Sequence, residues 1–234
     1  MRPVLAEPVW GLLPLPDGFA YIKYERYPEG RLIASFWQFS IPESQKSQIT
    51  QEQYLKYKLG ESFRQILEHI GHSKSLLCQA SSDRRGRLLA LCPETGRFNL
   101  FDSESGRLLR QGTLLYKDTP IISPVFAGES WWGICPGKNS VLNLKEDWSW
   151  NFYAGGEGNP SFPEPVHLSA YPGRDGNTRL YVCCKGSESI RSLNPDIQRL
   201  GIYDFCPLPG HQPLRYFRAA KKHLVLLANG VWAL

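Results

Sequence analysis

A pattern of apolar segment, tight turn and second apolar segment recurs along this chain and limits the folds that it can adopt. One turn of each unit carries a glycine, in the order Gly30, Gly96, Gly137, Gly186 and Gly230. Successive glycines are 66, 41, 49 and 44 residues apart. The first interval contains a helix-like insertion of roughly 25 residues, and without it the period falls near the 40–45 residues of a four-stranded propeller blade.

The clearest unit lies in the segment RLLALCPETGRFNLFDSESGRLLR. It reads as three strands in series, Arg87–Cys92, Arg97–Asp102 and Gly106–Arg110, separated by turns rich in Pro, Gly, Ser, Asp and Glu. Strands of five or six residues between such turns are typical of an antiparallel meander. We name the strands of each unit A to D in chain order.

The first strand of every unit can be assigned in the same way. The predicted A strands are Val9–Leu13, Leu76–Ala80, Ile121–Phe126, Val166–Tyr171 and Leu214–Ala219. A repeated four-stranded unit buries its faces only against its neighbours. The predicted fold class is therefore all-β, a small five-bladed β-propeller that forms a single domain over residues 1–234.

The fifth unit ends after its C strand, Val231–Leu234, and lacks a D strand. The short extended segment Met1–Ala6 directly precedes the first A strand. Pairing an N-terminal strand with the last sheet removes an otherwise open edge. We therefore predict that Met1–Ala6 is the outer strand of the last blade and closes the ring.

The insertion between the first two units is predicted to be one helix over residues 50–70. Thr50 and Gln53 have the spacing of a capping box, and Gly71 is suited to end the helix. One face is apolar, through Leu55, Leu59, Phe63, Ile66, Leu67 and Ile70. We expect this stripe to pack on the propeller and cover an edge; the alternative is a docking helix for a partner.

The segment from Asp102 to Leu109 has the pattern D-x-x-S-G-R-L-L and follows a glycine-containing turn. It resembles the blades of quinoprotein and WD40-type β-propellers, in which such a segment recurs. No repeat has the Gly-His pair together with the Trp-Asp pair of a true WD40 repeat, and no residues match a quinone site. The resemblance implies a propeller of degenerate repeats that holds no cofactor.

Composition argues against several classes of function. The formal net charge of +5 is a mild surplus, which permits an acidic partner without requiring one. The six cysteines form no C-x-x-C pair, so we expect no metal site. No segment approaches the roughly 20 apolar residues that span a bilayer, and the N-terminus lacks the apolar region of a signal peptide. We expect a cytoplasmic protein without a membrane partner.

The predicted A–B turns are mildly basic and share one face of a propeller. Their cations are Arg84, Arg85, Arg174, Lys221 and Lys222. They could meet an acidic protein surface or a phosphate backbone. The C–D turns bring acids to the same face, namely Asp102, Glu104, Glu146, Asp147 and Asp196. The simpler interpretation is a solvated face of mixed charge, and we do not expect nucleic acid as a partner.

Tryptophans are concentrated in the third unit. Large aromatics such as Trp131 and Trp148 ordinarily fill the space between blades, whereas an exposed one would be a candidate anchor for a partner. We keep both residues as candidate partner contacts beside the basic turns.

The function predicted from these features is a non-catalytic protein–protein interaction module, a scaffold or adaptor subunit of a larger assembly. The chain is similar in size to stand-alone propellers found beside AAA+ ATPases in bacterial conflict systems, which suggests such an assembly. The alternative is a hydrolase that acts on a carbohydrate or phosphoester at the channel mouth. It would use Glu7, Asp118 or Glu164, the carboxylates at the entries to the A strands.

Overall fold

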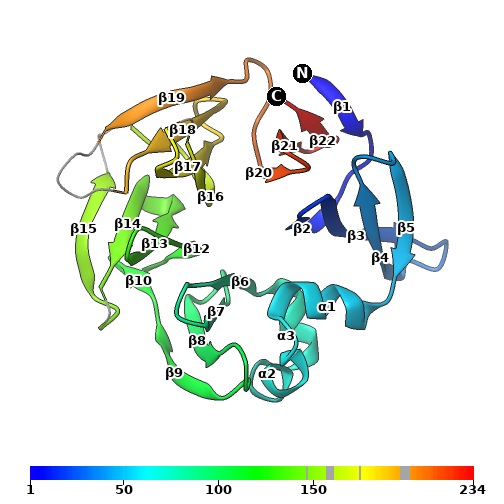
Figure 1. The fold of residues 1–234 in the computed structure, drawn as a ribbon, viewed down its shortest axis with the longest axis horizontal. Coiled ribbons are helices and arrows are strands. Elements are labelled where there is room, and N and C mark those ends of the chain that lie inside the picture. The colour runs from blue at the N-terminus through cyan, green and yellow to red at the C-terminus, as the bar shows by residue number, and fades with distance from the viewer. Residues whose placement is uncertain (146, 157–160, 174, 196–200) are drawn as a thin grey trace.

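The computed structural model describes residues 1–145, 147–156, 161–173, 175–195 and 201–234, without the side chains of residues 72, 73, 150–153 and 204. Five four-stranded antiparallel sheets stand around a central axis, so the chain is a five-bladed β-propeller (Figure 1). Strands β2, β6, β12, β16 and β20 lie innermost. The predicted fold class is confirmed.

The first four blades each come from one continuous stretch of chain. Blade 1 contains β2 (Trp10–Leu15), β3 (Gly18–Arg26), β4 (Leu32–Ser40) and β5 (Gln45–Ile49). Blade 2 contains β6 (Gln79–Ser82), β7 (Arg87–Leu91), β8 (Arg97–Asp102) and β9 (Leu108–Thr113). Blade 3 contains β12 (Ile122–Ala127), β13 (Ser130–Cys135), β14 (Ser140–Leu144) and β15 (Trp150–Gly155). Blade 4 contains β16 (Pro165–Pro172), β17 (Thr178–Cys184), β18 (Ser189–Leu193) and β19 (Ile202–Pro207).

Blade 5 joins the two ends of the chain. It contains β20 (Arg215–Ala219), β21 (Lys222–Leu227), β22 (Gly230–Ala233) and, as its outer strand, β1 (Arg2–Leu5). Strand β1 pairs antiparallel with β22, so that Pro3 lies opposite Trp232 and Leu5 opposite Val231. Figure 1 shows the two termini side by side. The predicted closure of the ring by the N-terminal strand is confirmed.

The local turn chemistry explains why the blades form where the repeats predicted them. In the C–D turn of blade 2, Asp102 Oδ1 accepts hydrogen bonds from Ser105 N (2.8 Å) and Ser105 Oγ (2.7 Å). Gly106 follows with φ +71°, a conformation that favours glycine. The D-x-x-S-G pattern is therefore a self-capped turn between β8 and β9.

The core lies between blades rather than at the axis. Separate apolar clusters fill the interfaces of blades 2 and 3, 3 and 4, 4 and 5, and 5 and 1. Between blades 1 and 2 stand helices instead (Figure 1). A tight two-stranded hairpin, β10 (Leu115–Tyr116) with β11 (Thr119–Pro120), connects blade 2 to blade 3. A 3-10 turn, η1 (Pro136–Lys138), links β13 to β14.

The insertion is three helices and not the single helix predicted. They are α1 (Gln51–Leu59), α2 (Phe63–Ile70) and α3 (His72–Leu77). The predicted capping box is present, because Gln53 N donates to Thr50 Oγ1 (3.1 Å) and Thr50 N donates to Gln53 Oε1 (2.8 Å). Gly60, with φ +84°, ends α1 within the predicted helix.

The predicted apolar stripe packs on the propeller, as expected. Leu55, Leu59, Phe63, Ile66 and Leu67 are buried against blade 2, in a cluster that includes Leu88 and Phe101. One further expectation about this region was wrong. The segment predicted as the A strand Leu76–Ala80 begins with the end of α3, and β6 starts only at Gln79. Strand β5 was not predicted, because its sequence, QKSQI, is mostly polar and exposed.

No helix in the described part of the chain is long and apolar enough to cross a membrane.

Candidate functional site

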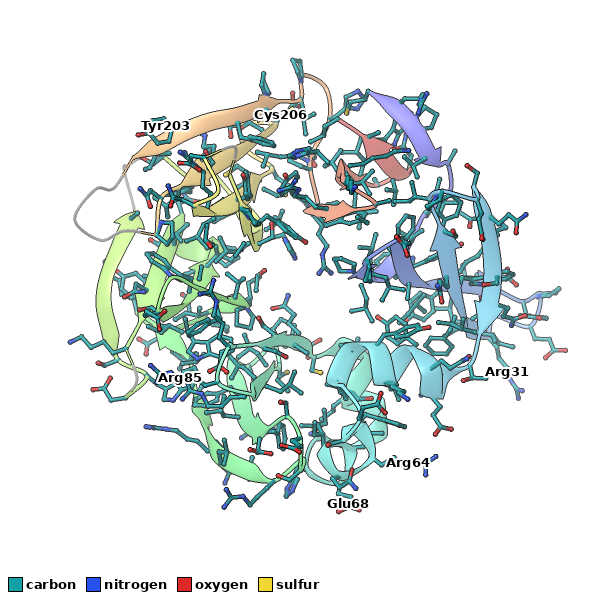
Figure 2. The ribbon with its side chains drawn as sticks, viewed as in Figure 1. Arg31, Arg64, Glu68, Arg85, Tyr203 and Cys206 are labelled. Atoms are coloured by element: carbon teal, nitrogen blue, oxygen red, sulfur yellow. The ribbon has the colours of Figure 1, made fainter. Side chains whose placement is uncertain are left out.

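A cavity of about 520 Å³ occupies the centre of the ring and is lined by all five inner strands together with α1 and the end of α3. Side chains project from the inner strands toward this space (Figure 2). Among the residues that the structure describes, no Asp or Glu lines the cavity. Its charged lining residues are Lys58 and Arg215, so the walls carry positive charge without a carboxylate.

Arg215 begins β20 and is partly buried. Its Nη1 donates a hydrogen bond to the carbonyl of Leu12 on the neighbouring blade, whereas its buried Nε has no hydrogen-bond partner. Burial lowers the pKa of this guanidinium. The groups that raise its pKa are two tyrosines and a thiol, Tyr171, Tyr54 and Cys183, and none of them is a carboxylate. Buried arginines are ordinarily paired with an acid. Among the described residues, Arg215 therefore has no acidic counter-ion.

Two further polar groups of the cavity wall belong to β16, the inner strand next to β20. His167 Nδ1 and Ser169 Oγ are buried and have no hydrogen-bond partner. Burial, reinforced by repulsion from Arg215, holds the pKa of His167 well below its usual value, so the imidazole is neutral at pH 7. His167 and Ser169 are two residues apart on one strand and thus share a face.

Lys58 supplies the second cation from α1. Its Nζ donates to the carbonyls of Ser75 (2.8 Å) and Leu76 (2.9 Å), which fastens the last turn of α3. Burial lowers its pKa, and Arg215 lowers it further. Lys58 thus has a structural role in addition to the charge that it brings to the cavity.

Hydrogen bonds between adjacent inner strands hold the rest of the cavity wall. Ser123 N donates to Gln79 Oε1 (2.5 Å), which joins blade 3 to blade 2. Ser123 Oγ accepts from Leu168 N (2.9 Å), which joins blade 3 to blade 4. Gln79, Ser123 and Leu168 are therefore already paired, unlike His167 and Ser169.

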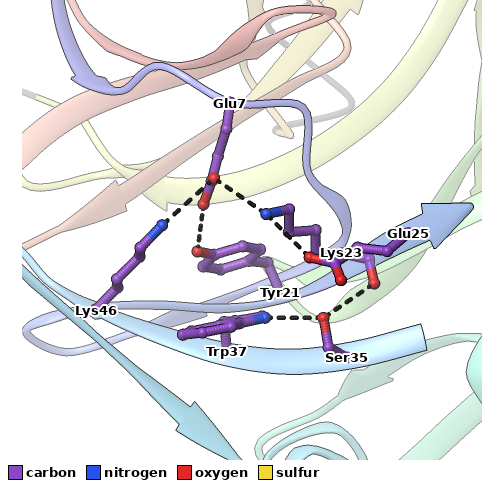
Figure 3. A network of polar contacts seen from close by, with 7 residues as sticks. All are labelled: Glu7, Tyr21, Lys23, Glu25, Ser35, Trp37 and Lys46. Atoms are coloured by element: carbon purple, nitrogen blue, oxygen red, sulfur yellow. Dashed lines mark hydrogen bonds and ion pairs between the residues drawn. The ribbon is translucent and has the colours of Figure 1, made fainter. Parts of the chain in front are cut away.

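The three carboxylates named for the hydrolase alternative do not line this cavity. Glu7 accepts a hydrogen bond from the Tyr21 hydroxyl (2.8 Å) and forms ion pairs with Lys23 (3.7 Å) and Lys46 (3.5 Å), as Figure 3 shows. Asp118 lies in the turn between β10 and β11. Glu164 is exposed beside η1, where its backbone N donates to Asn139 Oδ1. None of the three therefore stands where a carboxylate could act on a ligand bound in this cavity.

The structure exposes the basic turns that the sequence singled out. Arg84 and Arg85 lie in the A–B turn of blade 2, and Lys221 and Lys222 lie in that of blade 5, so blade 1 separates the two pairs (Figure 2 labels Arg85). Arg174 is outside the described residues, as are Glu146 and Asp196.

In blade 2 the acidic C–D turn lies beside the basic A–B turn, as predicted. Ser103, in the C–D turn, donates its backbone N to the carbonyl of Gly86 in the A–B turn (2.8 Å). Asp102 and Glu104 therefore lie close to the basic turn. This arrangement is that of a solvated face of mixed charge.

Trp131 and Trp148 of blade 3 pack in the core between blades. Trp131 is only 4% exposed and packs edge-on against Phe126, with ring centroids 5.3 Å apart. Trp148 is partly buried and stacks on Phe98 of blade 2, with centroids 4.6 Å apart. A side chain as buried as Trp131 cannot anchor a partner, which corrects its place among the candidate contacts. In Trp148, one ring face is covered by Phe98.

An apolar surface that the sequence analysis did not identify lies at the mouth of the cavity. Trp10, Tyr24 and Leu77 all line the cavity and are respectively 59%, 38% and 60% exposed. Trp10 and Tyr24 meet edge to face, with centroids 6.1 Å apart. We call these three residues the apolar rim. Trp10 starts β2, and Leu77 ends α3, so the rim depends on the inserted helices.

A second cavity, of about 670 Å³, lies between α2, α3 and blade 2. Unlike the central cavity, its lining includes an acid, Glu94, beside the cations Lys74 and Arg97. A hydrogen bond with Thr95 lowers the pKa of the Cys92 thiol in this cavity. Of these two cavities, the central one combines cations without a described acid with buried polar atoms that have no hydrogen-bond partner.

Comparison with solved structures concerns the fold. The chain is similar to a structural genomics protein of unknown function from Bacteroides thetaiotaomicron, with 8% identity and a TM-score of 0.51 over 96% of this chain and 68% of that one. It also aligns with a streptogramin B lyase, with 10% identity and a TM-score of 0.48 over 96% of this chain and 64% of that one. A third similar structure is the WD40 domain of Toxoplasma gondii coronin, with 10% identity and a TM-score of 0.47 over 93% of this chain and 52% of that one.

The chain thus spans about half to two thirds of the length of these structures. No family model matches it, and no curated protein matches it in sequence. This chain is a degenerate β-propeller repeat protein. Identities this low carry no activity or partner from one protein to another.

Proposed function

We propose that this chain is a non-catalytic, cytoplasmic protein-interaction module that binds its partner through the apolar rim. The observation that carries the proposal is the exposure of Trp10, Tyr24 and Leu77 at one cavity mouth. Exposed aromatic and aliphatic side chains gathered on one rigid surface are typical of contact sites. The rim also stands on β2, β3 and α3, elements that the ring holds in place.

The chemistry of the partner follows from the charge behind the rim. Lys58 and Arg215 line the cavity below it, and no carboxylate does so in the described residues. A partner segment that places apolar side chains on the rim therefore fits best if it also carries acidic groups. We propose an acidic, apolar segment of another protein as the occupant, in a multi-subunit assembly for which an AAA+ ATPase is one candidate.

The hydrolase alternative receives less support from the geometry. Glycosidases need two carboxyl groups roughly 5–10 Å apart across the substrate. Glu7 is held by Tyr21 and two lysines, away from the cavity. A non-catalytic role therefore remains the better proposal.

The proposal is tested by affinity purification from cells that express the protein naturally, followed by mass spectrometry. The full chain is compared with Trp10→Ala and with a matched control, Leu109→Ala, which removes an exposed apolar side chain (40%) on the outer strand β9. We expect a stoichiometric partner that Trp10→Ala reduces tenfold or more and Leu109→Ala retains. Equal recovery with both variants, or no stoichiometric partner of the wild-type chain, would overturn it.

A further inference from the structure

We infer that the central cavity is a binding site for an oxyanion, a phosphate or carboxylate group, with Arg215 as its principal counter-ion. The site stands whether or not a protein docks on the apolar rim. The anion can be a free small molecule or an acidic group carried by a partner.

The first argument is charge. Arg215 and Lys58 line the cavity from β20 and α1, the two elements on either side of β2. The lining holds no described Asp or Glu. Placing a guanidinium in a partly desolvated site is costly unless a negative charge accompanies it. A bound anion supplies the charge that the described part of the protein omits.

The second argument is the set of unpaired buried polar atoms. Arg215 Nε, His167 Nδ1 and Ser169 Oγ have no hydrogen-bond partner. The great majority of buried polar atoms in folded proteins are paired. All three atoms belong to residues that line this one cavity, so unsatisfied polar groups gather in its wall.

The third argument is size and access. The cavity of about 520 Å³ lies within the range of small-molecule sites and is large enough for phosphate or a short dicarboxylate. Arg215 is one of the residues that line this cavity. Trp10 and Leu77 surround the mouth and would restrict water around a bound anion, which strengthens its attraction to Arg215.

The test measures binding of sodium phosphate and of sodium succinate to the full chain by titration calorimetry. Sodium chloride at matched ionic strength serves as the reference, and thermal unfolding is recorded in the same solutions. We expect one of the two anions to bind with 1:1 stoichiometry and to raise the Tm above that in chloride. The anion that binds tells phosphate chemistry from carboxylate chemistry.

Arg215→Met removes the charge at similar volume and should weaken binding tenfold or more, as expected for loss of a charged hydrogen bond. Arg64→Met is the matched control, since Arg64 lies on the exposed surface of α2, and it should bind as the wild type does. If Arg215→Met does not fold, Ser169→Ala serves instead and should weaken binding severalfold. Absence of binding by both anions, or equal affinity in the cavity variant and the control, would overturn the inference.

Discussion

The closure of the ring can be tested at Gly230, the first residue of β22. Its φ is +139°, and a methyl group built on its Cα would lie 2.1 Å from the carbonyl oxygen of Leu5 on β1. Gly230→Ala therefore acts on the contact between the first and last strands of the chain. Gly176 is a matched control, because it also has positive φ (+77°) but open space around its Cα.

The size of the effect follows from two costs. A non-glycine residue in the backbone region of Gly230 costs about 1–3 kcal/mol. Leu5 must also move by roughly 1 Å to restore an ordinary contact, which disturbs the Leu5–Val231 pair and about two ladder hydrogen bonds at ~1 kcal/mol each. We expect Gly230→Ala to lower the free energy of unfolding by about 3–5 kcal/mol. Gly176→Ala should cost only the backbone penalty, about 1–2 kcal/mol.

Urea unfolding followed by far-ultraviolet circular dichroism measures both variants. The comparison is made between midpoints, provided that the slopes agree with that of the wild type. A midpoint for Gly230→Ala equal to that of Gly176→Ala would mean that pairing of β1 with β22 contributes nothing, and the reasoning on closure would be refuted.

Three further substitutions probe the helices, the polar network and the cavity. Leu59→Ala should lower the free energy of unfolding by about 2–5 kcal/mol, because Leu59 is fully buried between the helices and blade 2. The control, Leu109→Ala, should lower it by under about 1 kcal/mol in the same urea assay, because Leu109 is exposed. Glu7→Gln should cost about 1 kcal/mol, and the loss should shrink as salt is added, because the amide can still accept from Tyr21 but no longer forms the two lysine ion pairs. Since burial holds the pKa of His167 well below 6.5, stability should be complete above about pH 6.5 and should fall as pH drops below it, by up to about 1.4 kcal/mol per pH unit. His167→Gln should remove that part of the pH dependence between about pH 7 and 5.5, and an unchanged slope would contradict the assignment.

Local signals made the blades predictable. The C strand Arg97–Asp102 has the bounds predicted from the sequence, because it is an apolar segment between two turns. The same signals fail at β5, whose exposed polar residues leave no alternating pattern to detect. Edge strands that face water obey the hydrogen-bonding geometry of a sheet without its hydrophobic pattern.

The single predicted helix shows a different limit. The apolar stripe from Leu55 to Ile70 keeps the helical period through Gly60, so periodicity alone gives no reason for a break. In the structure Gly60 adopts positive φ and separates α1 from α2, and both helices still bury the stripe on blade 2. Burial of the face was thus predictable from the pattern, while the number of helices depended on one backbone conformation.

The cavity could not be predicted, because its residues come from parts of the chain far apart in sequence. His167 and Arg215 lie in two of the predicted A strands, Val166–Tyr171 and Leu214–Ala219. Their closeness becomes evident only when β16 and β20 stand side by side in the ring. An arginine inside a strand matches no catalytic motif, so no sequence signal indicated Arg215 either.

The helical insertion explains why Lys58 lies in the cavity wall and Leu77 at the cavity mouth. Five equal blades would place every inner strand beside its neighbour, but α1 stands between β2 and β6 (Figure 1). Tyr54 of α1 donates a hydrogen bond to the carbonyl of Gly11 on β2, and Lys58 of the same helix holds the end of α3. These contacts place Lys58 in the cavity wall and Leu77 at its mouth. A ring built only from the repeat would lack both, so the segment that interrupts the repeat supplies one of the two cavity cations and part of the apolar rim.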